Sequence, residues 1–170
     1  MSARAFWTAF AALALVALLP ILVTEIPAFA DYPNHLARAR VLAHFNESPF
    51  FGTFFRPAWA ILPNILTDLL MVGAAKVLPI TVAGRAVLSL IVVVIGAGFA
   101  FARREATGGY DALGFGGLLL VYGFPLTMGF LNFSLGVGLL LALFGLHLKL
   151  RERGSATYLV IMIPAGIGLF

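Results

Sequence analysis

The chain has 170 residues, of which 62% are apolar and only 11% are charged, with a formal net charge of +4 and no cysteine. Soluble domains carry roughly a quarter charged residues, so this composition excludes an ordinary soluble fold. Disulfide frameworks and thiolate metal sites are excluded as well. The basic residues flank apolar runs, which is typical of topology signals, so no nucleic-acid partner is expected. We expect an all-α, polytopic transmembrane helix bundle with the lipid bilayer as its surroundings.

The first apolar run, residues 6–24, is the first expected span, and Arg4 precedes it. An alternative comes from Ala28-Phe29-Ala30, which resembles a signal-peptidase site and would make residues 1–30 a signal peptide. The run exceeds the ~7–15 apolar residues of a signal-peptide core. This length favours an uncleaved first helix.

Residues 57–80 decide the topology of the chain. They are long enough to span a bilayer, but polar residues interrupt them, and a carboxylate such as Asp68 at mid-span costs about 2.5–3.5 kcal/mol. If they lie along the membrane surface, the basic clusters at the span ends all face the cytoplasm, as the positive-inside rule requires. Those residues are Arg4, Arg103, Arg104, Lys149, Arg151 and Arg153. We therefore expect 25–83 to be one outer loop and the N-terminus to be cytoplasmic.

Two short interfacial helices are expected in this outer loop, over residues 35–45 and about 64–77. Apolar strips alternate with polar ones in the first of them, which suits a membrane surface. The remaining expected spans are residues 84–102, 112–128 and 131–148, followed by 157–170. The last run has too few residues to cross ~30 Å of hydrocarbon, so we expect the chain to be the N-terminal part of a longer protein. Glycines in the later spans, including Gly136, Gly138 and Gly145, predict close helix packing.

A dense polar cluster follows the first span, from Asp31 to Arg38. Ionisable groups at membrane depth are candidates for function, and the expected topology places further polar residues at the same outer face. We identify Asp31 and His35 as catalytic candidates. The binding candidates are Arg38, Arg85, Asn64, Asp68, Asn132 and Tyr122. The alternative is that these side chains are polar because water surrounds the loop.

The cofactor is left open by the sequence. Asp31 and His35 can reach one divalent cation if a helix begins by Asp31, but two ligands do not make a metal site. Asp68, or the chain beyond Phe170, would have to supply a third ligand. No phosphate-binding glycine loop and no Ser-His-Asp grouping is present in the sequence.

The order of these features resembles the N-terminal part of the GT-C superfamily of membrane glycosyltransferases, which includes protein O-mannosyltransferases and the aminoarabinose transferases of lipid A. Asp31 corresponds to the acidic motif that opens the superfamily's first outer loop, where Tyr32 replaces the usual second acid. Residues 35–45 and 63–66 correspond to its two juxtamembrane helices. Arg85, within 83–89, resembles the arginine that opens the next span, and Arg103-Arg104 its basic end. In the turn 129–133, Asn132 occupies a position where a second aspartate is common.

This resemblance implies an integral membrane enzyme that transfers a sugar from a polyprenyl-phosphate donor to an acceptor at the outer face of a bacterial inner membrane. It implies that Asp31 takes the proton of the acceptor hydroxyl and that Arg85 and Arg38 hold the donor phosphate. The alternative is a non-catalytic polytopic protein, such as a transporter half or an assembly subunit. In that case the Asp31 cluster only orders the loop.

Overall fold

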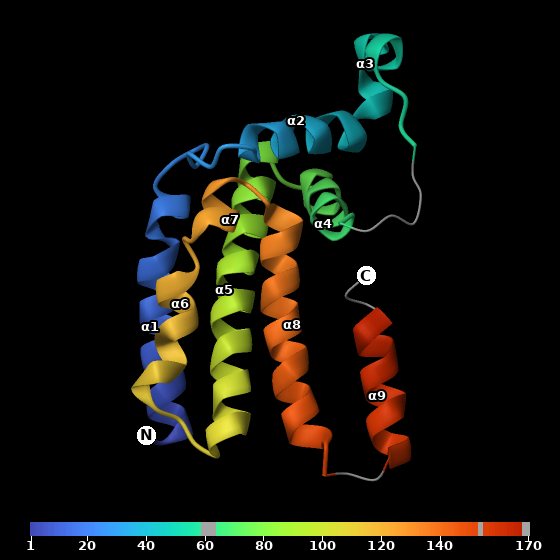
Figure 1. Cartoon of the computed structure of the whole chain (residues 1–170). Helices are drawn as coiled ribbons and strands as arrows, with labels where there is room; N and C mark the ends of the chain where they lie inside the picture. The colour runs from blue at the N-terminus through green and yellow to red at the C-terminus, as the bar shows by residue number, and fades with distance from the viewer. Residues whose placement is uncertain (59–63, 153–154, 168–170) are drawn as a thin grey trace.

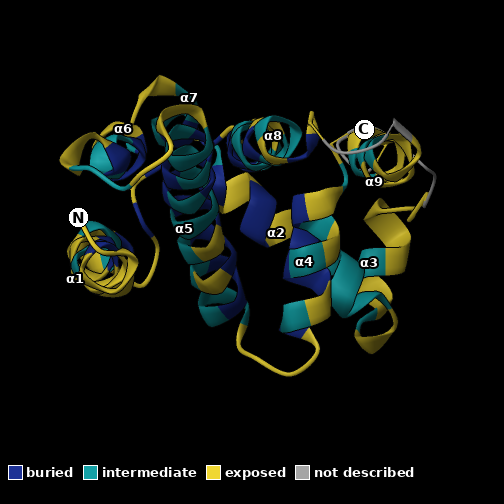
Figure 2. Ribbon diagram, turned by 90° about the horizontal axis from the view of Figure 1, so that it is seen from below, coloured by how far each residue is buried: buried dark blue, intermediate teal, exposed yellow. Residues whose placement is uncertain are grey.

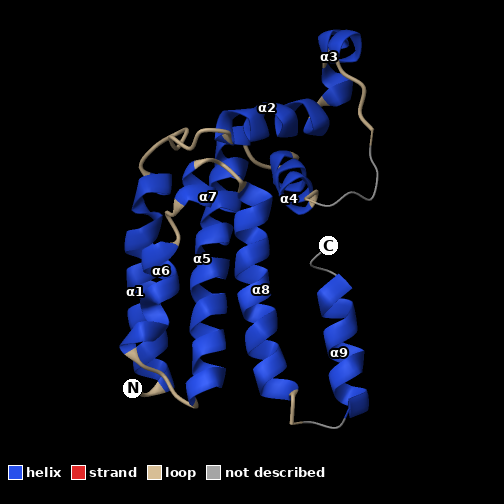
Figure 3. Ribbon diagram, viewed as in Figure 1, coloured by secondary structure: helices blue, strands red, loops and turns tan. Residues whose placement is uncertain are grey.

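Three long helices form the body of the molecule: α1 (Ala3–Leu22), α5 (Ile80–Thr107) and α8 (Leu131–Leu150). They run side by side in the computed structural model, which describes residues 1–58, 64–152 and 155–167 (Figure 1). Each of the three is long and apolar enough to cross a membrane. Those described residues form helices, turns and loops and contain no strand (Figure 3). The all-α class is thus confirmed, and so is the expectation of several membrane-length helices.

The most extensive helix interface, between α5 and α8, depends on glycine. A Cβ atom at Gly138 would lie 2.8 Å from the backbone nitrogen of Ile95, and one at Gly98 would collide with the carbonyl oxygen of Gly138. Only residues without a side chain allow the two backbones to approach this closely. Gly145 also contacts α5, whereas nothing lies within 4 Å of a Cβ at Gly136. The expected close packing therefore holds for Gly138 and Gly145 and not for Gly136.

Residues 112–128 form three short helical pieces in place of one long helix. They are η2 (Ala112–Phe115), α6 (Gly116–Leu120) and α7 (Phe124–Thr127). The break falls at Gly123, and Pro125 occupies the first turn of α7, where its missing N–H costs no helical hydrogen bond. The piece α6 lies along α5, and α7 packs against α8 near the end of the bundle that α2 crosses (Figure 1).

Two short helices cross one end of the bundle. They are α2 (Tyr32–Ala43) and α4 (Leu66–Ala75), and they take the places expected for the helices over 35–45 and 64–77 (Figure 1). Between them lie η1 (Phe45–Glu47) and α3 (Pro49–Phe54). Helix α4 has only 10 residues, about 15 Å at 1.5 Å per residue, which is half the thickness of a bilayer core.

The last helix, α9 (Ser155–Ile167), packs against α8, where His147 Nδ1 lies 2.9 Å from the hydroxyl of Tyr158. Residues 168–170 of the last expected run, and Arg153 of the basic cluster, lie outside the described residues. Arg4, Arg103, Arg104 and Lys149 belong to the bundle end opposite α2 and α4 (Figure 1).

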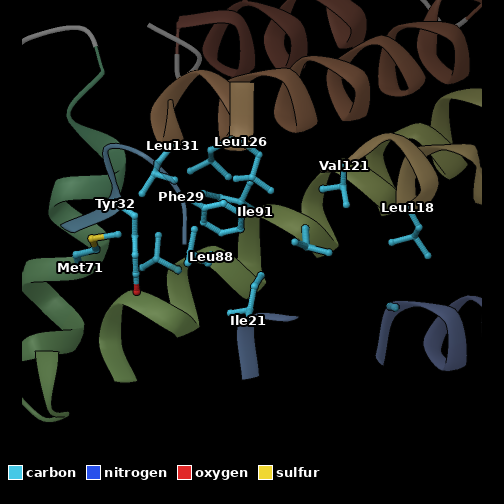
Figure 4. Close-up of a cluster of buried hydrophobic side chains, with 14 of the residues drawn as sticks. Ile21, Phe29, Tyr32, Met71, Leu88, Ile91, Leu118, Val121, Leu126 and Leu131 are labelled. Atoms are coloured by element: carbon cyan, nitrogen blue, oxygen red, sulfur yellow. The ribbon is translucent and has the colours of Figure 1, made fainter. Parts of the chain in front are cut away.

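One part of the buried core lies directly beneath α2 and α4, and the rest continues along the bundle to Phe6 and Phe10 of α1. Tyr32 and Met71 from these helices are fully buried against side chains of the long helices (Figure 4). The same buried cluster includes Ile21, Phe29, Leu88, Ile91, Leu118, Val121, Leu126 and Leu131. Exposed residues lie mainly on the outward faces of the helices (Figure 2). The first turn of α2 is therefore fixed to the bundle by apolar packing.

Candidate functional site

The segment before α2 is bound to the turn between α7 and α8. The backbone N–H of Ala30 donates to the carbonyl of Thr127 at 3.0 Å, and that of Asp31 donates to Met128 at 3.2 Å. Gly129 follows with a φ of 84°, and a Cβ there would lie 2.7 Å from the nitrogen of Asp31. Both the left-handed backbone and the close approach require glycine. Residues nearly a hundred positions apart are thus held side by side.

His35, buried on the first turns of α2, is fixed in one tautomer by its neighbours. Its Nε2 lies 3.0 Å from the carbonyl oxygen of Gly129 and 3.4 Å from Oδ2 of Asp31, and both of these are acceptors. Its Nδ1 lies 3.0 Å from Nη2 of Arg38, which is a donor. These contacts require a neutral ring with its proton on Nε2. The imidazole therefore donates toward the turn and Asp31 and accepts from Arg38.

The carboxylate of Asp31 is oriented and still half open to solvent. Asn34 donates to its Oδ1 at 2.7 Å, and His35 Nε2 faces its Oδ2. The side chain is 47% exposed. A carboxylate has about four lone-pair sites, so further acceptor positions on Asp31 face the solvent. Asp31 occupies the N-cap position of α2, but its side chain does not cap the helix.

Arg38 joins α2 to α4. Its Nε and Nη2 donate to Oδ1 of Asp68 at 3.0 and 2.7 Å. The Asp68 side chain is only 13% exposed, whereas that of Arg38 is 49% exposed. The same guanidinium contacts His35. A continuous polar chain thus runs from Asp68 through Arg38 and His35 to Asp31.

Asn132, at the start of α8, holds the N-terminus of α4. Its Oδ1 accepts from the backbone N–H of Thr67 at 2.9 Å. Ile65 at the N-cap has no side-chain oxygen for this purpose, so a residue from another helix supplies the cap. Asn64 precedes with a φ of 64°, a conformation that asparagine tolerates better than most residues.

An open cavity of about 310 Å³ lies where these elements meet. The candidates Asp31, His35, Arg38, Asn64 and Asn132 line it together with Gly129, Phe130, Leu131 and Phe133. Asp68 joins this group through Arg38. Most of the polar residues selected from the sequence therefore gather around one cavity at the end of the bundle.

Arg85 and Tyr122 are not in this cavity. Arg85 Nη1 donates to the carbonyls of Leu22 and Thr24 at 3.3 and 3.4 Å, where a cation complements the C-terminal dipole of α1. The Tyr122 hydroxyl donates to the carbonyl of Ala17 at 2.6 Å. Both side chains tie α1 to its neighbours, and neither lines the cavity that contains Asp31.

The sequence did not identify Gly129 as a residue of the site. It placed this glycine in a turn, where glycine between apolar runs is expected. The carbonyl of Gly129 is nevertheless a main partner of His35. Nor did the sequence predict that Asp68 pairs with Arg38, because 30 residues separate the two.

The acidic and imidazole groups do not converge on a metal position. Among the described residues, no three His, Asp or Glu side chains approach one another closely enough to hold an ion. Asp68, the third ligand considered from the sequence, is bound by Arg38 instead. We therefore derive no chemistry here from a metal.

Fold and site together define an integral membrane helix bundle with a polar cavity at one end. No protein-family model, curated protein or solved structure matches the chain. Function is therefore inferred from the site alone.

Proposed function

We propose that this chain carries the acidic site of a membrane glycosyltransferase that uses a polyprenyl-phosphate-linked sugar. The observation that carries the proposal is Asp31, a half-exposed carboxylate oriented by His35 and Asn34 in an open polar cavity. The cavity lies at the end of a bundle of membrane-length helices. A lipid-linked donor and a water-borne acceptor would meet in such a place.

The reaction follows from the groups around the cavity. Asp31 accepts the proton of an acceptor hydroxyl while the hydroxyl oxygen attacks the anomeric carbon of the sugar. The bond from that carbon to the phosphate oxygen breaks, and polyprenyl phosphate leaves with the electron pair. Arg38 stabilises the phosphate charge, because a guanidinium pairs well with phosphate oxygens. Asp68 positions Arg38 for this role.

The geometry favours Arg38 over Arg85 as the phosphate partner. The guanidinium of Arg85 contacts carbonyls at the end of α1, away from Asp31. Arg38 lines the cavity and is half exposed. In this proposal Arg85 acts on the site only by holding α1 in place.

The proposed setting is the inner membrane of a bacterium, with the cavity at the outer face and the N-terminus in the cytoplasm. Support comes from the basic residues Arg4, Arg103, Arg104 and Lys149, which belong to the bundle end opposite the cavity. Basic residues at span ends favour the cytoplasmic side.

A second candidate is a non-catalytic membrane protein, a transporter half or an assembly subunit, in which the polar chain only orders the loop. The observation that favours it is the internal pairing of the polar groups: Arg38 binds Asp68, and Asn132 caps α4. In that case Asp31 would contribute to stability and not to catalysis.

The test is Asp31→Asn in the complete gene product, assayed in isolated membranes with radiolabelled polyprenyl-phosphate sugars. Sugar transfer should fall by the ~10²–10⁴-fold typical of losing a general base. Glu25→Gln is the matched control, since Glu25 is an exposed carboxylate of the same loop, and it should transfer at the original rate. The second candidate would be favoured if Asp31→Asn transferred sugar at the original rate. It would also be favoured if the unsubstituted protein transferred sugar from none of the donors.

A further inference from the structure

A second cavity lies between α2 and the segment that follows α3. Its volume is about 410 Å³. Residues three and four positions apart on α2 share a helix face and form one wall, and residues 55–57 form the other. Most of the lining is apolar and consists of Ala37, Val41, Leu42, Phe55 and Pro57. Because two arginines also line it, the cavity is an apolar groove bordered by cations.

Arg56, on the second wall, is an exposed cation without an acidic partner. The chain has seven Asp and Glu residues, all within the part that the structure describes, and none of them forms an ion pair with Arg56. On the α2 wall, Arg38 binds Asp68 through Nε and Nη2. A guanidinium has five N–H donors, so Arg38 has donors left over. An anion in the groove would therefore meet a guanidinium from each wall, and phosphate pairs well with such groups.

The helix beside the groove exposes phenylalanine rings. Phe50 and Phe54 of α3 are 59% and 67% exposed, Phe55 is 45% exposed, and α3 has no buried residue. The rings of Phe50 and Phe54 lie 4.7 Å apart and form one aromatic surface. Helix α3 lies beyond the end of α2 and clear of the long helices (Figures 1 and 2). Aromatic and basic side chains together are typical of segments in the headgroup region of a bilayer, so the surroundings that fit α3 are lipid.

We propose that this groove binds the headgroup of an anionic glycerophospholipid from the surrounding membrane. Arg56 and Arg38 hold the phosphate, and the apolar wall contacts the start of the acyl chains. The two cations match an anion, whereas the apolar wall and the exposed rings of α3 match a lipid better than a free ion. Arg38 also lines the polar cavity, so Arg56 is the cation that belongs to this groove alone. The inference goes beyond the proposed function, because it requires no sugar transfer.

The experiment measures the lipid that the complete protein retains, by native mass spectrometry after release from nanodiscs. The nanodiscs contain phosphatidylcholine with a minor fraction of phosphatidylglycerol, and phosphatidylglycerol should be retained preferentially. Arg56→Gln should weaken this retention about tenfold, the lower end for losing hydrogen bonds to a charged group. Arg40→Gln is the matched control, since Arg40 is an exposed arginine of α2 that does not line the groove. It should retain the lipid fully, and an equal fall would show diffuse attraction to the surface and overturn the site.

A second variant tests the groove without changing its charge. Ala37 is exposed and lines the groove, so Ala37→Trp fills it from outside the core and should also lower the retention of phosphatidylglycerol. Equal retention of the two lipids, or unchanged retention in Arg56→Gln, would overturn the inference. Displacement of the lipid by glycerol phosphate would show a site for soluble anions, and displacement by an equal concentration of polyprenyl phosphate would assign the groove to the donor. Asp31→Asn should lose sugar transfer and keep the lipid, so the two proposals can fail separately.

Discussion

The ion pairs Arg38–Asp68 and Arg103–Asp111 lie at the two ends of the bundle and differ in how far apart their residues are along the chain. At the α2–α4 end, Arg38 binds Asp68 across 30 residues, and His35 contacts the carbonyl of Gly129 across 94. At the other end, Arg103 binds Asp111, only eight residues away. The first pair joins two helices, whereas the second forms within one helix end and the turn after it. Distant parts of the chain meet at this second end through the hydrogen bonds that Met1 and Trp7 donate to Tyr110.

The long-range pair is the one that borders the polar cavity. A local pair such as Arg103–Asp111 secures a turn, and its hydrogen bonds lower the pKa of Asp111 below the usual value for aspartate. A long-range network forms only after the helices have packed, so it can enclose a space between them.

The two ends should lie on opposite sides of the membrane. The chain has no cysteine, and side chains added at Gly52 and Gly109 meet no neighbour within 4 Å. An impermeant maleimide applied to intact cells should label Gly52→Cys and not Gly109→Cys, which should react only after permeabilisation. If only Gly109→Cys were labelled in intact cells, the orientation of the protein in the membrane would be the reverse of the one proposed.

Gly129→Ala should destabilise the protein more than Gly108→Ala at the other end. Both glycines have positive φ values, 84° and 75°, so each substitution costs about 1–2 kcal/mol for the left-handed backbone. Only at Gly129 would the new Cβ meet the backbone of Asp31. Thermal unfolding in detergent should show a midpoint lower by several degrees for Gly129→Ala. Equal midpoints would mean that the Asp31 segment is not held against this turn.

Asn132→Ala should remove the cap that α8 provides to α4. Loss of an N-cap acceptor costs about 1 kcal/mol, which lowers the unfolding midpoint by about 2–4 °C in a chain of this size. Asn132→Asp keeps the oxygen that accepts from Thr67 and places a negative charge at a helix N-terminus. It should therefore unfold close to the original temperature, and a loss as large as that of Asn132→Ala would exclude the capping role.

Tyr32→Phe should have the smallest effect at neutral pH. The Tyr32 hydroxyl is buried without a hydrogen-bond partner among the described residues, so its removal should be neutral or slightly stabilising. Burial raises the pKa of Tyr32 from 10.0 to about 12, against an opposing effect of Arg85. Because the folded pKa is the higher one, the free energy of unfolding is unaffected by this group below pH 10 and falls as the pH rises from 10 toward 12. Urea titrations from pH 9 to 12 should show a smaller alkaline loss of stability for Tyr32→Phe; an identical loss would place the hydroxyl in solvent.

The helical class and the placement of the short helices α2 and α4 follow from the amino-acid sequence alone. The length and apolarity of the runs over α1, α5 and α8 are local properties, and a bilayer leaves helices as the solution for such runs. The interruptions by Pro63, Asn64 and Asp68 similarly indicated a short α4. These features depend on neighbouring residues and on the solvent, so they can be predicted from the order of residues along the chain.

Which polar residues contact one another depends on how the helices pack. Asp31 and Arg85 both belong to the α2 end, yet one faces the cavity and the other caps α1. The pairing of Arg38 with Asp68, and the close approach of Gly129 to Asp31, depend on how α2, α4 and the α7–α8 turn pack. A hydrogen bond requires two groups within about 3 Å, and spacing along the chain does not specify that distance for residues 30 to 100 positions apart. The packed helices specify it, and with it the shape of the cavity.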